Sequence, residues 1–158
     1  MKIKDRAAVR VFCFLFIGLV IIGLTLSGCE SVLESYGKAE GVFSVIHVKT
    51  DTVSEADVVG AYLRFARSEN LQCAPISNAP RPTLSCHRNG LHLDAIRYPN
   101  RVKFTSLLEP GYFYYSAPPD ENREKAMEKA LKGAKAPFRV FNTRFSEYLR
   151  SNFANAVE

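Results

Sequence analysis

The sequence predicts an α+β fold, a two-layer sandwich in which a mostly antiparallel sheet carries helices on one face. Alternating apolar residues flank Asn89 and Gly90, and an Asn-Gly pair in that setting is the strongest short signal for a β-hairpin. Apolar residues recur at helical spacing in residues 55–69 and again after Pro137. The expected elements follow the order β-α-β-β-β-α-α, and antiparallel hairpins with helices on one face form two layers.

The first expected elements are a strand and a helix. Residues 41–50 (GVFSVIHVKT) are rich in β-branched side chains, which favours a strand, and we expect it at the centre of the sheet. Ser54 comes before residues 55–69, with Asp57 three positions later, a pattern typical of a helix N-terminus. The helix has one broad apolar face, formed by Val58, Val59, Tyr62, Leu63, Phe65 and Ala66.

The predicted hairpin covers residues 83–98, and its two-residue turn sets its register. Such a turn places Cys86 opposite Leu93 and His87 opposite His92. Alternate residues of a strand point to the same side, so one face of the hairpin is apolar. That face is expected to point into the core, and it consists of Leu84, Cys86, Leu91, Leu93 and Ala95.

A further strand is expected at residues 102–109, ended by Pro110 and Gly111. Residues 112–115 (YFYY) fit a short strand or an aromatic loop. Four consecutive aromatic side chains in a strand face both sides of the sheet. The exposed ones, among Tyr112, Tyr114 and Tyr115, would form a binding surface for a sugar ring or a peptide; alternatively, the aromatic side chains fill the core and a contact between elements.

Two helices are expected at the C-terminal end. The first is charged and covers about residues 121–133, with Asp120 as its cap and Gly133 at its end. The second begins after Pro137, where apolar side chains recur at spacings of three and four. Alternatively, residues 138–142 form a strand before a shorter helix.

The N-terminus has the plan of a secretory signal. Residues 1–10 carry four basic side chains and one acidic side chain. An uncharged, apolar run follows from Val11 to Leu26, and small residues then lead to Cys29. The basic end stays on the cytoplasmic side of the membrane while the apolar run enters it. Residues 1–28 are therefore predicted to be a signal peptide.

The end of this run, Leu26-Ser27-Gly28-Cys29, resembles the lipobox of bacterial lipoproteins. The resemblance covers only the signal and the attachment site. It implies cleavage before Cys29, a diacylglycerol on its thiol, a fatty acid such as palmitate on its amine, and a membrane anchor made of lipid. The alternative is an uncleaved transmembrane anchor, for which the apolar run falls just short of the roughly 17–25 residues that span a bilayer.

This resemblance divides the chain into a signal peptide (residues 1–28), a lipidated cysteine with a polar tether (residues 29–40) and a single globular envelope domain (residues 41–158). Glu30 follows the cysteine, where proteins of this class that stay in the inner membrane carry Asp. The resemblance therefore implies the outer membrane, facing the periplasm, if the organism has two membranes.

The basic balance of the chain belongs mostly to the signal. The chain has 21 Lys and Arg against 16 Asp and Glu, a net charge of +5. Residues 1–28 hold four of the basic and one of the acidic side chains, which leaves a net charge of +2 for the rest. No dense basic stretch remains, so the sequence indicates no nucleic-acid partner.

Cys73 and Cys86 remain once Cys13 is assigned to the signal and Cys29 to lipid. An even pair in an oxidising envelope predicts a disulfide. It would close a loop of about 14 residues and stabilise the fold by roughly 3 kcal/mol in the chain-entropy model. Residues 74–83 between the two cysteines contain three prolines and are expected to be a loop.

The predicted register brings His87 and His92 together on the solvent face, with Asp94 two residues further along. Two imidazoles and a carboxylate can ligate a divalent metal ion; alternatively, all three are ordinary solvated positions. Cys86 and His87 are strand neighbours that point to opposite faces, so they form no catalytic dyad. No nucleophile elbow or phosphate-binding glycine loop is present in the sequence.

The sequence thus predicts a lipid-anchored cell-envelope protein, a non-catalytic interaction or binding module without a cofactor. Its partners are the membrane, through lipid at Cys29, and an envelope protein or the cell wall. The alternative is a small envelope hydrolase or metal-binding protein that uses His87, His92 and Asp94.

Overall fold

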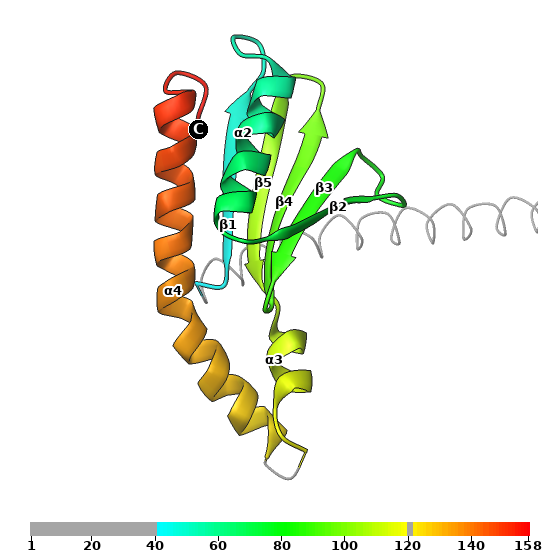
Figure 1. Cartoon of the computed structure of the whole chain (residues 1–158), viewed down its shortest axis with the longest axis vertical. Coiled ribbons are helices and arrows are strands. Elements are labelled where there is room, and N and C mark those ends of the chain that lie inside the picture. Colours follow the sequence, from blue (N-terminus) through cyan, green and yellow to red (C-terminus); the bar gives the residue numbers. More distant parts are fainter. Residues whose placement is uncertain (1–40, 120–121) are drawn as a thin grey trace, which may run out of the picture. The chain divides into compact units, whose positions relative to one another are not determined.

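The computed structural model describes residues 41–119 and 122–158, so the predictions for residues 1–40 and Asp120 lie outside the described residues. The chain divides into two compact units, and every described residue belongs to the second, Gly37–Glu158. Five strands form one antiparallel sheet, with helices over one face, so the predicted α+β two-layer sandwich is confirmed (Figure 1). The elements are β1 (Phe43–Lys49), α2 (Glu55–Ser68), β2 (Gln72–Ile76), β3 (Thr83–Arg88), β4 (Leu91–Tyr98), β5 (Arg101–Leu108), α3 (Pro110–Ser116) and α4 (Arg123–Asn152).

The strands lie in the order β1-β5-β4-β3-β2, and each neighbouring pair is antiparallel. The β3–β4 hairpin has the predicted register, with Cys86 opposite Leu93. Asn89 and Gly90 have φ angles of 49° and 76°. A two-residue hairpin turn of type I′ requires positive φ at both positions, which explains why this Asn-Gly pair sets the register correctly.

The prediction that the first strand is central was wrong, because β1 lies at the edge of the sheet beside β5. The C-terminal tail covers part of its free edge. The amide of Lys49 donates to the carbonyl of Ala156 at 2.8 Å, and the amide of Glu158 donates to the carbonyl of His47 at 2.8 Å. A covered edge cannot pair with another chain. The partners of β1, namely β5 and the C-terminal tail, are far from it in sequence. No local sequence pattern therefore indicates that β1 lies at the edge.

The stretch predicted as a loop contributes a strand instead. β2 (Gln72–Ile76) pairs antiparallel with β3 and is exposed along its whole length at the other edge of the sheet. Pro75 lies within it, and proline is tolerated on an edge strand because no partner needs its missing N–H. The element order is therefore β-α-β-β-β-β-α-α, with one strand more than predicted.

Helix α2 and the C-terminal half of α4 pack on the inner face of the sheet. Ser54 is the N-cap of α2 as predicted, although its side chain accepts no hydrogen bond there. Aromatic side chains join the two helices to each other: the ring of Phe65 lies 4.8 Å from that of Phe145 and 5.5 Å from that of Phe141, centroid to centroid. The largest fully buried side chains of this core are Tyr62, Phe104, Phe145, Leu93, Leu149, Val48, Val58 and Val102.

Residues 123–152 form a single helix, α4, where the sequence predicts two. Gly133 and Pro137 lie inside it, so neither ends a helix, and residues 138–142 are helical. Proline inside a helix removes one hydrogen bond and bends the axis, and Figure 1 shows α4 changing direction midway. Although α4 is long, no helix of the described residues is apolar enough to cross a membrane.

The aromatic segment is also helical. Residues 112–115 belong to α3 (Pro110–Ser116), so they are neither the strand nor the loop that the sequence predicted. Pro110 stands in the first turn, where the N–H that proline lacks would have no helical partner. Helix α3 packs against α4, and α3 and the N-terminal half of α4 extend beyond the end of the sheet (Figure 1).

Candidate functional site

A cavity of about 630 Å³ opens between α3, α4, the tip of the β3–β4 hairpin and the end of β5. Its polar lining comes from Glu69, Arg88, Asn89 and Arg144. Concave, mostly apolar sites of roughly 300–1,000 Å³ with a few convergent polar groups are typical of ligand-binding pockets. The apolar lining includes Leu91, Leu108, Phe113, Ala134, Phe138 and Val140.

The cavity lies where α4 bends, and Pro137 itself lines it. A second, smaller hydrophobic cluster forms beyond the bend, around Val42, Leu108 and Phe138. Side chains of both the main core and this second cluster line the cavity. The bend thus directs one half of α4 toward the sheet and the other half toward α3, with the cavity between.

Helix α3 is held at the hairpin tip by backbone and ring contacts. The amide of Glu109 donates to the carbonyl of Gly90 at 2.7 Å. A Cβ atom on Gly90 would lie 2.6 Å from Cδ1 of Tyr112, a separation that side-chain packing does not permit. Gly90 is therefore required twice, for its positive φ and for the close approach of the Tyr112 ring.

The three tyrosines predicted as a binding surface have different environments. Tyr112 packs on the turn, and the guanidinium of Arg123 lies 5.8 Å from the ring of Tyr114. Tyr115 is 80% exposed. Phe113, which the prediction passed over, lines the cavity. In a helix, with 3.6 residues per turn, these four neighbouring side chains point in different directions. The strand that the sequence predicted would have placed them alternately on two faces.

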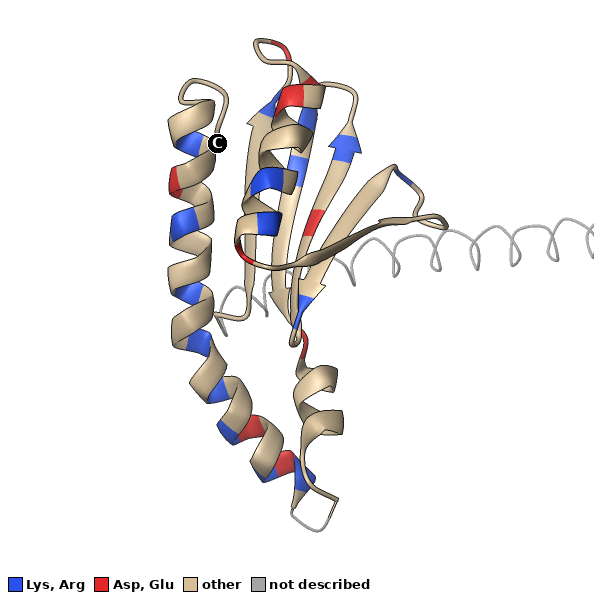
Figure 2. Ribbon diagram, in the orientation of Figure 1, with Lys and Arg blue, Asp and Glu red and all other residues tan. Residues whose placement is uncertain are grey.

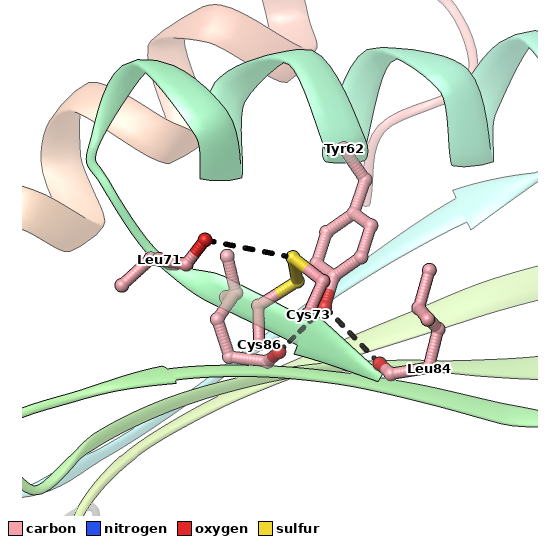
Figure 3. The surroundings of a disulfide bond; sticks show 6 residues. Tyr62, Leu71, Cys73, Leu84 and Cys86 are labelled. Atoms are coloured by element: carbon pink, nitrogen blue, oxygen red, sulfur yellow. Dashed lines mark hydrogen bonds between the residues drawn. A yellow bond between two sulfur atoms is a disulfide. The ribbon is translucent and has the colours of Figure 1, made fainter. Parts of the chain in front are cut away.

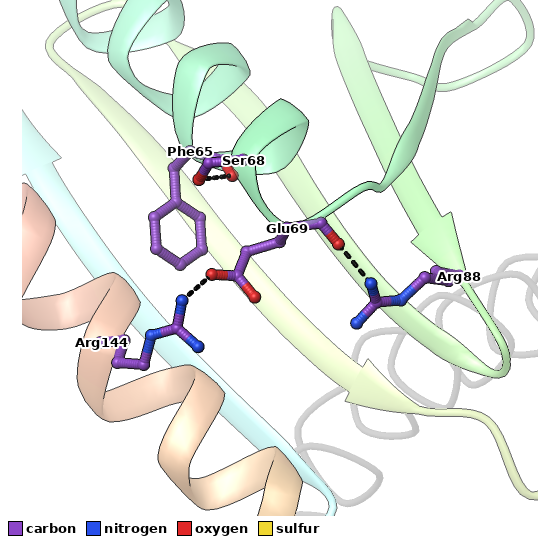
Figure 4. Close-up of polar contacts among 5 residues, drawn as sticks. All are labelled: Phe65, Ser68, Glu69, Arg88 and Arg144. Carbon is purple, nitrogen blue, oxygen red and sulfur yellow. Dashed lines mark hydrogen bonds and ion pairs between the residues drawn. The ribbon is translucent and has the colours of Figure 1, made fainter.

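A buried carboxylate organises the polar side of the cavity. The Glu69 side chain is only 10% exposed and accepts a charged hydrogen bond from Nη2 of Arg144. Nη1 of Arg88 donates to the backbone carbonyl of Glu69 at 2.5 Å. Figure 4 shows the two guanidinium groups approaching Glu69 from α4 and from β3. Two guanidinium groups beside one carboxylate leave the cavity with a net positive charge.

The histidine pair forms as predicted, whereas the predicted metal triad does not. His87 lies opposite His92, and their rings stack with centroids 5.8 Å apart. Nε2 of His92 lies 2.9 Å from Oε2 of Glu109, and Asp94 has a buried carboxylate oxygen. Throughout residues 41–119 and 122–158, no three His, Cys, Asp or Glu side chains gather closely enough to hold a metal ion.

The predicted disulfide between Cys73 and Cys86 is present, with its sulfur atoms 1.99 Å apart. It joins β2 to β3 beneath Tyr62 of α2 (Figure 3). Cys86 is fully buried, as its place on the apolar face predicts, while Cys73 is exposed on the edge strand. The bridge fixes the outermost strand of the sheet.

Comparison of the chain with protein-family models, with curated proteins and with solved structures found no match. The cavity residues Glu69, Arg88 and Arg144 were not predicted from the sequence. Glu69 and Arg144 are 75 positions apart, and only the docking of α4 against the end of α2 brings them together.

Proposed function

We propose that this chain is a lipid-anchored cell-envelope protein whose folded domain is a non-catalytic binding module, with the cavity between α3 and α4 as its binding site. Three features of the sequence support the anchor: the basic N-terminus, the apolar run and the lipobox-like Leu26-Ser27-Gly28-Cys29. On this proposal the domain faces the periplasm from the outer membrane if the cell has two membranes.

The observation that carries the binding role is the cavity, with its apolar lining and the exposed side chain of Val140. Val140, which lines the cavity, is 58% exposed. Phe113 of α3 and Phe138 of α4 also line the cavity. Apolar side chains gathered at a concave site mark a place where a ligand or partner covers them.

The polar side chains of the cavity favour binding over catalysis. Glu69 is engaged by Arg144, and its backbone carbonyl by Arg88. A general acid or base needs a group free to reach the proton that it transfers, whereas a binding site needs fixed charge. Arginine stays protonated throughout the physiological pH range and provides that charge.

A photo-crosslinking amino acid at Val140 in the full-length chain tests this proposal in intact cells. We expect an adduct of defined mass at position 140, because the cavity binds its ligand there. The matched control is Ile76, an aliphatic residue of similar exposure (44%) on β2, where no such adduct is expected. Equal labelling at both positions, or none at Val140, would contradict the proposed site.

A further inference from the structure

We propose that the cavity binds an amphiphile with one acyl chain and a carboxylate or phosphate head group, with the chain against the apolar lining and the head group held by Arg88 and Arg144. This inference rests on the proposed function, because it takes the cavity to be the binding site and names the class of ligand. It assigns the head group to the two guanidinium groups and the acyl chain to the bend of α4.

The apolar part of the cavity suits a flexible hydrocarbon chain. Phe113, Ala134 and Phe138 supply its lining from α3 and α4, and Leu91 and Leu108 supply it from the sheet. These side chains offer no hydrogen-bonding groups. A hydrocarbon chain needs no hydrogen-bonding groups, and the removal of apolar surface from water drives it into such a site.

The charged part suits an anion. Arg144 and Arg88 converge on Glu69, whose carboxylate balances only one of the two positive charges. Among the described residues, Arg88 commits one of its five N–H donors to protein, through Nη1. The described residues leave its other donors unused, and a guanidinium fork binds carboxylate or phosphate oxygens in a bidentate manner.

The surrounding field also favours an anion. Helix α4 carries eight Lys and Arg against three Asp and Glu, and the basic residues are spread along its length (Figure 2). A positive field around a cleft raises the local concentration and association rate of anionic ligands.

A peptide is a poorer match to the same cavity. An extended peptide needs hydrogen-bond acceptors for its backbone amides as well as donors for its carbonyls. Among the side chains that line the cavity, only Glu69 and Asn89 can accept, and Glu69 is already paired with Arg144. The donor-rich lining therefore favours a ligand that presents acceptors at one end only.

The test measures displacement of the fluorescent fatty acid cis-parinarate from residues 30–158, a segment that contains the whole described core. Dodecanoate and dodecyl phosphate should both displace the probe, and dodecanol should do so at least tenfold more weakly. Acetate and inorganic phosphate alone should not displace it. Dodecanol equal to dodecanoate would overturn the anionic head group, and displacement by the small anions would overturn the acyl chain.

Two variants separate the head-group and chain contributions. Arg88→Gln removes the guanidinium while keeping an uncharged polar side chain, and should weaken dodecanoate at least tenfold while leaving dodecanol unchanged. Ala134→Phe fills the apolar cavity and should abolish binding of both. Its control, Ala130→Phe, adds the same ring at an exposed position of α4 and should bind normally. Unaltered binding by Ala134→Phe, with circular dichroism showing a folded protein, would overturn the assignment.

Failure of this inference is distinguishable from failure of the proposed function. A defined protein or peptide adduct at Val140 without any amphiphile binding would reject the inference and retain the binding site. Loss of both the adduct and the amphiphile binding would reject the two together.

Discussion

Tyr62 connects the two layers of the fold through one side chain. Its hydroxyl donates to the carbonyl of Leu93 at 2.6 Å and also lies 3.1 Å from the carbonyl of Leu84. Its ring packs on Phe104, with centroids 5.5 Å apart. Burial, and to a smaller extent the negative charge of Asp94, raises the pKa of the Tyr62 phenol well above its ordinary value near 10.

This raised pKa predicts a loss of stability at alkaline pH. The unfolded chain releases the Tyr62 proton above about pH 10 while the folded protein keeps it, so ionisation favours the unfolded state there. The free energy of unfolding should fall by up to about 1.4 kcal/mol per pH unit above pH 10 because of this group. Tyr62→Phe should remove that component and cost about 1 kcal/mol at pH 8, where the hydroxyl still donates.

Urea unfolding at pH 8, 10.5 and 11 measures both effects. The wild-type protein should lose stability more steeply than Tyr62→Phe between pH 10.5 and 11. Parallel losses in the two proteins would show that Tyr62 is not the group that titrates.

For some residues the local sequence predicts which side chain they contact in the fold, and for others it does not. His87 and His92 are predictable as a pair because the turn at Asn89 and Gly90 fixes their register locally. Glu69 and Arg144 are not, since neither residue carries a local pattern and only tertiary packing joins them.

At the scale of elements, the disulfide secures the least protected strand. β2 is exposed along its length and has a single neighbour, β3, at the edge of the sheet. A strand of this kind gains little from apolar burial, so its order depends on the ladder to β3 and on the bridge from Cys73 to Cys86.

Removing the bridge should loosen β2 before the rest of the sheet. The variant Cys73→Ala with Cys86→Val keeps an apolar side chain at the buried position and should lower the free energy of unfolding by about 3 kcal/mol. Hydrogen exchange should accelerate most in β2, while β4 and β5 stay protected. An unchanged urea midpoint, or uniform acceleration over all five strands, would contradict this role.

A helix or strand is predictable from the sequence where the local spacing of apolar residues determines it. It is not predictable where a proline or tertiary contacts determine it. The α2 helix and the β3–β4 hairpin follow their apolar periods. Pro75 and Pro137 both argue against regular structure locally, yet each is accommodated, on an exposed edge strand and at a helix bend respectively. Helix α3 escaped prediction because residues 112–115 carry no distinguishing period.

At the scale of the whole molecule, the proposed protein is a folded domain attached to a membrane by a lipid anchor. The two-layer fold was predictable because periodicity and turn signals in several segments agree. The cavity was not, because it depends on where the bend of α4 meets the hairpin tip and α3. On the proposed function, a lipid at Cys29 holds this cavity near the membrane, which raises its effective concentration for envelope ligands.

Metabolic labelling with palmitate in growing bacteria tests the anchor, on which the proposed role depends. The full-length chain and the control Cys13→Ala, which changes a cysteine outside the lipobox-like residues, should both take up label and lose residues 1–28. Cys29→Ala should take up no label and keep its precursor length, because the acylated residue is missing. Normal labelling of Cys29→Ala, or a wild-type chain that stays unlabelled and uncut, would contradict the account.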